Sequence, residues 1–165
     1  MPNPSTHDYC AQLADVLLQR HWTMASAESC SGGLIAGACT DLAGSSAWFE
    51  RGFVTYSNEA KTEMLGVDRA LIARCGAVSK EVVRAMVRGA LQHAHAQVAV
   101  AVTGIAGPSG GSQTKPVGTV WFGWATPQGV VSEVQFFPGD RTQVRSATVH
   151  HALARLVTLL QSEAS

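Results

Sequence analysis

Apolar residues recur at helical spacing in several separate segments of this chain. In the clearest case, Val82, Val83, Met86, Val87 and Leu91 share one face of a helix that Ser79 would cap. The final helix is expected to begin at Asp140, with Gln143 three residues later in a capping-box arrangement. In all, helices are predicted over residues 5–20, 31–42, 57–66, 68–74, 79–93 and from 140 onward.

Segments rich in β-branched, aromatic or small apolar residues lie between these helices. Strands are predicted near residues 23–27, 48–57, 98–102, 119–125 and 130–137. The segment 98–102 is apolar on both faces, as in a central strand, and Pro127-Gln128-Gly129 predicts a hairpin turn. The alternation predicts an α/β fold in which helices pack on a mixed sheet. No linker or repeat interrupts it, so we expect one domain over 1–165 with a short tail at 1–5.

Composition narrows the function classes. The chain has 165 residues, of which 46% are hydrophobic and only 15% charged, and its formal net charge is zero. A neutral chain has no bulk field for nucleic acid or an acidic membrane surface, and so few charges favour an oligomer. Since the start of the chain lacks a signal-peptide pattern and no apolar run is long enough to span a bilayer, we expect a cytoplasmic location.

The four cysteines, Cys10, Cys30, Cys39 and Cys75, form no Cys-x-x-Cys pair. Structural zinc is therefore not expected, and the six histidines form no metal-binding signature either. Scattered cysteines in an untargeted chain are typical of reduced thiols in the cytoplasm. We expect no metal and no other cofactor.

The first candidate for chemistry is the stretch from Ala27 to Gly33, which predicts a strand, a tight turn and a helix. It offers two nucleophiles, Ser29 and Cys30, and one acid, Glu28. Backbone N–H groups at such a turn can stabilise an anion, and the two glycines permit close approach of a ligand. The alternative is a serine helix cap followed by a glycine-rich turn with no catalytic role.

A serine nucleophile needs a base, and Lys61 is the best candidate because it follows a strand-to-helix junction. Lysine can act as a base once burial lowers its pKa, and serine–lysine pairs are a known variant of the catalytic triad. The alternative is a solvated helix lysine. Tyr56 could polarise a hydroxyl or stack on a ligand; otherwise it is a core tyrosine. For Cys30 we favour a buried thiol behind the turn.

A second candidate is the glycine-rich run from Thr103 to Gly111, which is predicted to be a loop after the central strand. It lacks the endings of a Walker loop and of a dinucleotide-binding loop. Arg141 is expected in the first turn of the last helix, where it would oppose the helix dipole unless an anion is bound nearby. A phosphate site and a solvated arginine both remain open for this residue.

Taken together, these segments resemble the CinA C-terminal domain family in its stand-alone form. Two departures are mild: Ser31 stands where the family often has threonine, and Arg51-Gly52 where many members have Gly-Gly. The matching pieces, in family order, are Glu28-Ser29-Cys30-Ser31-Gly32-Gly33, Tyr56-Ser57-x-x-x-Lys61, Leu65-Gly66-Val67, Gly76-Ala77-Val78-Ser79, Thr103-Gly104-Ile105-Ala106-Gly107-Pro108 and Lys115-Pro116-Val117-Gly118.

The resemblance implies a three-layer α/β/α sandwich, a homodimer and a metal-free nicotinamide mononucleotide deamidase of pyridine nucleotide salvage. On this basis we expect Ser29 to be the nucleophile, Lys61 its base and later the acid, and Tyr56 an assisting hydrogen-bond partner. Backbone groups of Ser31, Gly32 and Gly33 would hold the oxyanion. Further substrate contacts are expected from Thr103, Gly104 and Ile105 at the pyridine ring, and from Gly107 and Arg141 at the ribose phosphate.

Three other functions are compatible with the sequence to different degrees. A non-catalytic nucleotide sensor would keep the glycine-rich loop but would not need both Ser29 and Lys61. An enzyme for a related phosphorylated amide or a pyrophosphate-linked nucleotide would share the same residues. A direct DNA role, suggested by the family name, is disfavoured because the chain is neutral and lacks a basic-aromatic pattern.

Overall fold

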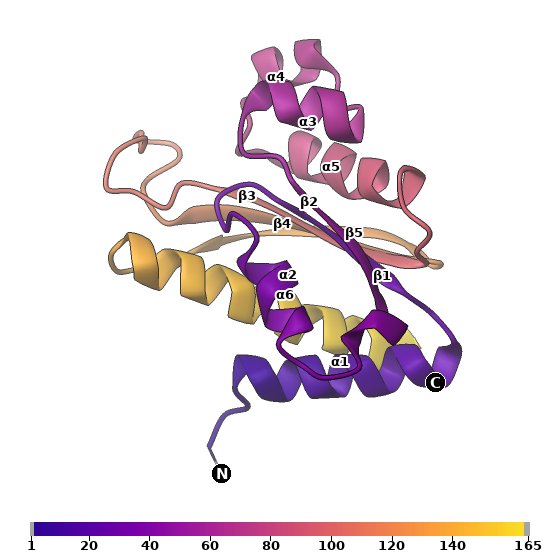
Figure 1. Cartoon of the computed structure of the whole chain (residues 1–165). Helices are drawn as coiled ribbons and strands as arrows, with labels where there is room; N and C mark the ends of the chain where they lie inside the picture. Colours follow the sequence, from indigo (N-terminus) through magenta and orange to yellow (C-terminus); the bar gives the residue numbers. More distant parts are fainter. Residues whose placement is uncertain (1, 164–165) are drawn as a thin grey trace.

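The computed structural model describes residues 2–163 as a five-stranded sheet between two layers of helices (Figure 1). The expected three-layer α/β/α sandwich is therefore confirmed. Met1 of the predicted tail and the last two residues of the predicted domain lie outside the described residues. In chain order the elements are α1 (Thr6–Arg20), β1 (Met24–Glu28), α2 (Leu34–Thr40), the 3-10 turn η1 (Ser45–Ala47), β2 (Phe49–Val54), α3 (Asn58–Leu65), α4 (Arg69–Cys75), α5 (Lys80–Gln92), β3 (Val98–Gly104), β4 (Thr119–Thr126), β5 (Gly129–Phe136) and α6 (Arg141–Glu163).

The sheet is mixed, with strand order β2-β1-β3-β4-β5. β1 pairs in parallel with both β2 and β3, whereas β3, β4 and β5 pair antiparallel. Helices α1, α2 and α6 cover one face, and α3, α4 and α5 cover the other (Figure 1). The parallel half therefore brings the ends of three strands to one edge, and the antiparallel half extends the sheet beside it.

Each face of the sheet contributes to its own hydrophobic core. In β3, Val98, Val100 and Val102 point to the core shared with α1 and α6. The intervening Ala99 and Ala101 point to the second core, shared with α5. All five side chains are fully buried. This is the pattern of a central strand covered on both faces, as the uninterrupted apolar run predicts.

The structure corrects three predicted boundaries near the glycine-rich segments. The helix expected over 31–42 begins only at Leu34, because Gly32 and Gly33 adopt φ angles of 59° and 107° that no right-handed helix contains. The strand expected to reach Ser57 ends at Val54, since Ser57 caps α3 by accepting a hydrogen bond from the N–H of Ala60 at 3.0 Å.

The third correction concerns the start of the predicted loop at Thr103. Thr103 and Gly104 are instead the last residues of β3, paired with Trp121 and Val120 of β4. Backbone pairing overrides the local glycine signal here, because β4 supplies partners up to this point. Gly104 also has no room for a side chain, since an added Cβ would lie 2.7 Å from Val120. Among residues 2–163, no helix has the length and apolar character needed to cross a membrane.

Candidate active site

Three segments that follow parallel strands meet at one edge of the sheet. Ser29 follows β1, Tyr56 follows β2 and Ile105 follows β3. The carboxyl ends of parallel strands share an edge, and open α/β sheets bind their ligands there. All three residues line one cavity of about 290 Å³. The fold therefore brings together residues separated by more than seventy positions in the sequence.

Ser29 and Lys61 are in direct contact at the bottom of this cavity. The Lys61 ammonium nitrogen lies 3.1 Å from the Ser29 hydroxyl oxygen. The two side chains are nearly inaccessible, with Lys61 1% and Ser29 8% exposed. A buried lysine at hydrogen-bond distance from a serine has the geometry of a nucleophile and its general base. The structure therefore brings together two residues whose contact the sequence left open.

The protonation state of Lys61 is set by its surroundings. Burial lowers the pKa of the Lys61 amino group, and the neighbouring Cys30 thiol opposes part of this shift. The amino group also donates to three backbone carbonyls, those of Thr55 at 3.0 Å and of Tyr56 and Ser57 at 3.4 Å each. A neutral amine can donate two of these bonds and keep its lone pair for the Ser29 proton. The carbonyls thus orient Lys61 toward Ser29.

Glu28, the acid of the motif, has a structural role instead of facing the cavity. Its buried carboxylate accepts hydrogen bonds from the Ser31 hydroxyl at 2.5 Å and from the N–H groups of Ile35 and Ala36 at 2.8 and 3.0 Å. These N–H groups belong to the first turn of α2. A carboxylate at this position satisfies helix donors and complements the dipole. Glu28 therefore fixes the start of α2 directly behind the serine turn.

Cys30 belongs to the cavity lining, but the residue is almost completely buried. The side chain is 5% exposed, and burial raises the pKa of the thiol to about 11. Its sulfur packs against Gly104, where an added Cβ would lie 3.1 Å from it. A thiol that stays protonated is a poor nucleophile, which agrees with the preferred interpretation of Cys30 as a packing residue.

The structure does not bring Ser31, Gly32 and Gly33 to the cavity wall. The Ser31 hydroxyl is bound to Glu28, and the Gly32 N–H donates to the carbonyl of Ser29 at 3.1 Å. Cys30 is the residue of this turn after Ser29 that lines the cavity, and its N–H has no acceptor from another residue within the described part of the chain. The turn forms because Gly32 and Gly33 tolerate positive φ. Cys30 N–H is thus better placed than the predicted groups to meet an oxyanion.

The strand end and loop after β3 form a second wall. The Thr103 hydroxyl donates to the carbonyl of Ala77 at 2.9 Å, so it braces the segment before α5. Ile105 donates from its N–H to the carbonyl of Thr119 at 2.9 Å. Thr103, Gly104, Ile105 and Gly107 all line the cavity, as predicted. Because the Thr103 hydroxyl is already bonded to Ala77, its role is to hold the Ala77 segment in the cavity wall.

Arg141 and Tyr56 form the rim of the cavity. Arg141 donates to the carbonyl of Gly107 at 2.8 Å and to the hydroxyl of Tyr56 at 3.0 Å. Tyr56 is 59% exposed, so it is not a core tyrosine, and its phenol contacts Arg141 whereas its backbone carbonyl contacts Lys61. Asp140 and Gln143 form the predicted capping box at 2.8 and 2.9 Å. The start of α6 is thereby fixed with the guanidinium facing the loop.

One cavity residue, Asn58, was not singled out from the sequence. Asn58 is exposed at the start of α3 and lines the cavity beside Lys61. The spacing of three residues between them places both on one helix face, and this signal could have identified Asn58. Ala77 and Val78 also line the cavity, as do the exposed Ser109 and Gly110 of the loop. The bonds from Thr103 to Ala77 and from Arg141 to Gly107 help to hold these segments together.

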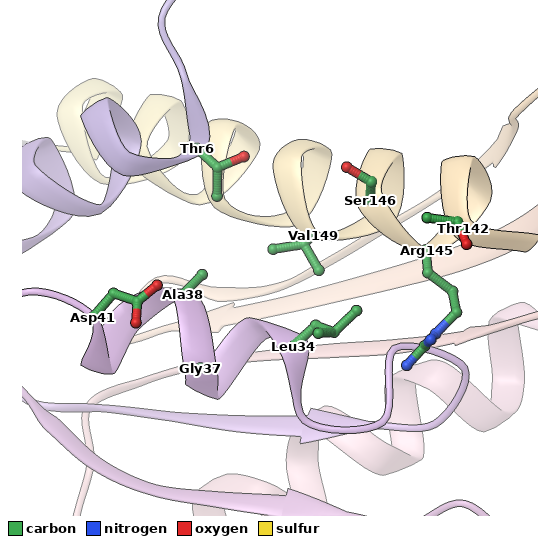
Figure 2. A pocket seen from close by; sticks show the side chains of 9 residues that line it. All are labelled: Thr6, Leu34, Gly37, Ala38, Asp41, Thr142, Arg145, Ser146 and Val149. Atoms are coloured by element: carbon green, nitrogen blue, oxygen red, sulfur yellow. The ribbon is translucent and has the colours of Figure 1, made fainter.

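A larger cavity of about 420 Å³ lies elsewhere, between α2 and α6 (Figure 2). Leu34, Ala38 and Val149 form its apolar surface, and Arg145 and Asp41 contribute its charges. It contains no nucleophile–base pair, so the chemistry points to the smaller cavity. Within residues 2–163, no group of three or more histidine, cysteine or acidic side chains is arranged to hold a metal ion.

Comparison with known proteins assigns the family. The family described as the CinA C-terminal domain matches residues 6–160. The chain belongs to this family. Nicotinamide-nucleotide amidohydrolase PncC of Enterobacter agglomerans is 54% identical over 146 residues, which cover 88% of this chain and 89% of that protein. A CinA-like protein of Akkermansia muciniphila is 51% identical over 89% of this chain but only 36% of its own length.

Solved structures agree with this assignment. The competence/damage-inducible protein CihA of Agrobacterium tumefaciens superposes with a TM-score of 0.91 at 43% sequence identity. The match covers 96% of this chain and 98% of that one. The fold is therefore that of the family over nearly its whole length.

Proposed function

We propose that the protein is a nicotinamide-nucleotide amidohydrolase, which converts nicotinamide mononucleotide and water to nicotinic acid mononucleotide and ammonia. The observation that supports this most is the buried contact of 3.1 Å between Ser29 and Lys61. The name of the Enterobacter agglomerans relative supplies the substrate class, since 54% identity covers most of both chains. A sensor without chemistry would have no need for a buried lysine aimed at a serine.

In the first half-reaction, neutral Lys61 takes the proton of the Ser29 hydroxyl as the serine oxygen attacks the carboxamide carbon. The carbonyl oxygen becomes an oxyanion, which the N–H of Cys30 stabilises. The intermediate collapses as its C–N bond breaks, and the Lys61 ammonium returns the proton to the leaving nitrogen. Ammonia departs and an ester of Ser29 remains.

In the second half-reaction, Lys61 takes a proton from a water molecule that attacks the ester. The bond to Ser29 breaks and the serine oxygen regains a proton from Lys61. The acid product leaves and releases its remaining proton to solvent as the carboxylate forms. Each step uses the same two side chains, so no metal or other cofactor is required by the mechanism. The base works only as the neutral amine, which its burial favours.

Substrate binding uses the rim and the loop wall. Arg141 and the loop around Gly107 would hold the phosphate, because a guanidinium and free backbone donors suit an anion. Gly104 and Ile105 would contact the pyridine ring. Tyr56 supports Arg141 through its hydroxyl. These roles place the phosphate at the open rim and the carboxamide at the buried pair.

The cellular setting follows from the same proposal. The reaction would serve pyridine nucleotide salvage in the cytoplasm, and we expect a homodimer. Light scattering after size-exclusion chromatography measures the oligomeric state, and a monomer at micromolar concentration would overturn that expectation.

The test of function is ammonia release by the purified protein given nicotinamide mononucleotide, with Ser29→Ala and a chelator-treated sample in parallel. We expect turnover that survives chelation and disappears with Ser29→Ala. No ammonia from folded wild-type protein would overturn the proposal and favour a nucleotide sensor, which calorimetry would then detect. Faster release from another phosphorylated amide or from a pyrophosphate-linked nucleotide would reassign the substrate.

A further inference from the structure

Arg145 connects the last helix to the serine turn, although it does not line the catalytic cavity. Its Nε donates to the carbonyl of Cys30 at 3.1 Å and its Nη2 to the carbonyl of Ser31 at 3.3 Å. Figure 2 shows the side chain pointing from α6 toward the loop that leads into α2. One guanidinium thus binds the two residues that directly follow Ser29.

The turn needs such support because its backbone is intrinsically soft. Gly32 and Gly33 adopt positive φ and lack side chains that would restrict them. Arg145 packs directly on this glycine segment, since an added Cβ on Gly32 would lie 3.3 Å from Nη2. The planar guanidinium fork holds two acceptors in one fixed geometry, which a lysine cannot do.

The hydrogen bonds of the peptide groups after Ser29 and Cys30 indicate which part of the backbone Arg145 would fix. The carbonyl of Ser29 is held by the N–H of Gly32, and the carbonyl of Cys30 is held by Arg145. In a trans peptide the N–H points opposite to the carbonyl of the preceding residue. The N–H of Cys30 therefore points away from the interior of the turn. Because the carbonyls of Ser29 and Cys30 are both held by hydrogen bonds, the orientation of the Cys30 backbone is fixed.

We propose that Arg145 is a positioning residue that aligns the N–H of Cys30 with the oxyanion formed at Ser29. The inference rests on the proposed function, in which Ser29 is the nucleophile. The inference gives different roles to two arginines that lie one helical turn apart. In the proposed function Arg141 faces the cavity and contacts substrate, whereas Arg145 acts through the backbone of the serine turn. The positive charge also lies close enough to Cys30 to favour its thiolate, so it favours negative charge at the turn.

The cavity of Figure 2 offers a direct way to test this role. Arg145 borders that cavity of about 420 Å³, so truncation to alanine opens a path for a small cation to reach the two carbonyls. The exposed Ser146 borders the same cavity and makes no hydrogen bond with the turn. Ser146→Ala is therefore a matched control on the same helix.

The experiment measures kcat and KM for nicotinamide mononucleotide in Arg145→Ala, Arg145→Lys and Ser146→Ala. Loss of an oxyanion donor lowers kcat by about 10²–10³-fold in other enzymes, so a misaligned donor should cost about 10–100-fold. We expect that loss in kcat for Arg145→Ala with KM changed less than about threefold, a smaller loss for Arg145→Lys and none for Ser146→Ala. Millimolar guanidinium chloride should restore part of the kcat of Arg145→Ala, whereas sodium chloride should not.

Unchanged kcat in folded Arg145→Ala, or a rise in KM alone, would overturn the inference. A second contrary result has two parts: guanidinium does not restore the kcat of Arg145→Ala, and the melting temperature falls equally in Arg145→Ala and Arg145→Lys. This result would give Arg145 a role in folding and would also overturn the inference. A second readout separates this result from failure of the proposed function. Labelling of Ser29 by a fluorophosphonate, followed by mass spectrometry, requires no nucleotide substrate. If the wild-type protein is labelled but releases no ammonia, the proposed substrate is wrong. The inference about Arg145 then stands if Arg145→Ala lowers the labelling rate of Ser29 and falls if it does not. Absence of labelling would overturn both the proposed function and the inference about Arg145.

Discussion

The inner wall and the rim of the candidate active-site cavity differ in how deeply their residues are buried. The inner wall contains the buried residues Ser29, Cys30 and Lys61, and the Lys61 amino group is held by the Ser29 hydroxyl and the Thr55 carbonyl. The rim consists of exposed residues, Tyr56, Arg141 and the loop at Ser109, held mainly by one arginine. A buried, fixed pair suits a reaction that needs an altered pKa, whereas an open rim suits binding and release of a charged nucleotide.

This contrast predicts that inner-wall changes alter kcat and rim changes alter KM. The largest effect is expected from Lys61→Ala, which removes the group that we propose as both the base and the later acid. By analogy with serine hydrolases, its kcat should fall by about 10⁴–10⁶-fold. Steady-state ammonia release measures the loss. Cys30→Ala is the matched control, because the same turn keeps its backbone; if Cys30→Ala lost activity and Lys61→Ala kept it, the assignment of the pair would be wrong.

Arg141→Ala tests the rim. Loss of a charge-assisted hydrogen bond costs about 1.5–3 kcal/mol, so KM for nicotinamide mononucleotide should rise by about 10–100-fold with little change in kcat. The same variant should alter KM for nicotinamide riboside, which lacks the phosphate, only slightly. Equal effects on both substrates would remove Arg141 from the phosphate site.

The pH dependence sharpens the comparison because Lys61, on the inner wall, is a proposed base with a shifted pKa. Burial lowers the pKa of Lys61, so its neutral form is reached at a lower pH than for an exposed lysine. As pH falls below that pKa, Lys61 becomes protonated, and kcat/KM should decrease by about tenfold per pH unit. A profile of kcat/KM against pH should show this limb in Arg141→Ala as well as in wild type. If the pKa of this decrease in kcat/KM shifted in Arg141→Ala, the titrating group would belong to the rim instead of the inner wall.

The smallest effect is expected from Tyr56→Phe. This change removes the hydroxyl that accepts from Arg141 but keeps the ring and the backbone carbonyl that orients Lys61. One exposed hydrogen bond is worth about 0.5–1.5 kcal/mol, so KM should rise by about two- to tenfold. Steady-state kinetics on Tyr56→Phe measure it. A loss of kcat above about a hundredfold would instead place the phenol in the chemical step.

Much of the fold follows from local patterns that are independent of the rest of the chain. The helix caps at Ser57, Ser79 and Asp140 lie where the sequence places them, because capping depends on a few neighbouring residues. The apolar run at 98–102 is the central strand. Errors occur where tertiary contacts override local preference, as when β4 pairs with Thr103 and Gly104 and extends the strand into the predicted loop.

The sequence by itself determined the family, the α/β layers and the residue types of the site, since motifs and periodicity are local properties. Only the tertiary structure decided which of these groups meet. It placed the Glu28 carboxylate on the first-turn N–H groups of α2, left Ser31 to Gly33 out of the cavity lining, and placed Arg145 on the serine turn across more than a hundred residues. Burial, which lowers the pKa of Lys61, also arises only when β1, β2 and α3 pack together. Distances and desolvation are properties of packed elements, and no spacing along the chain specifies them.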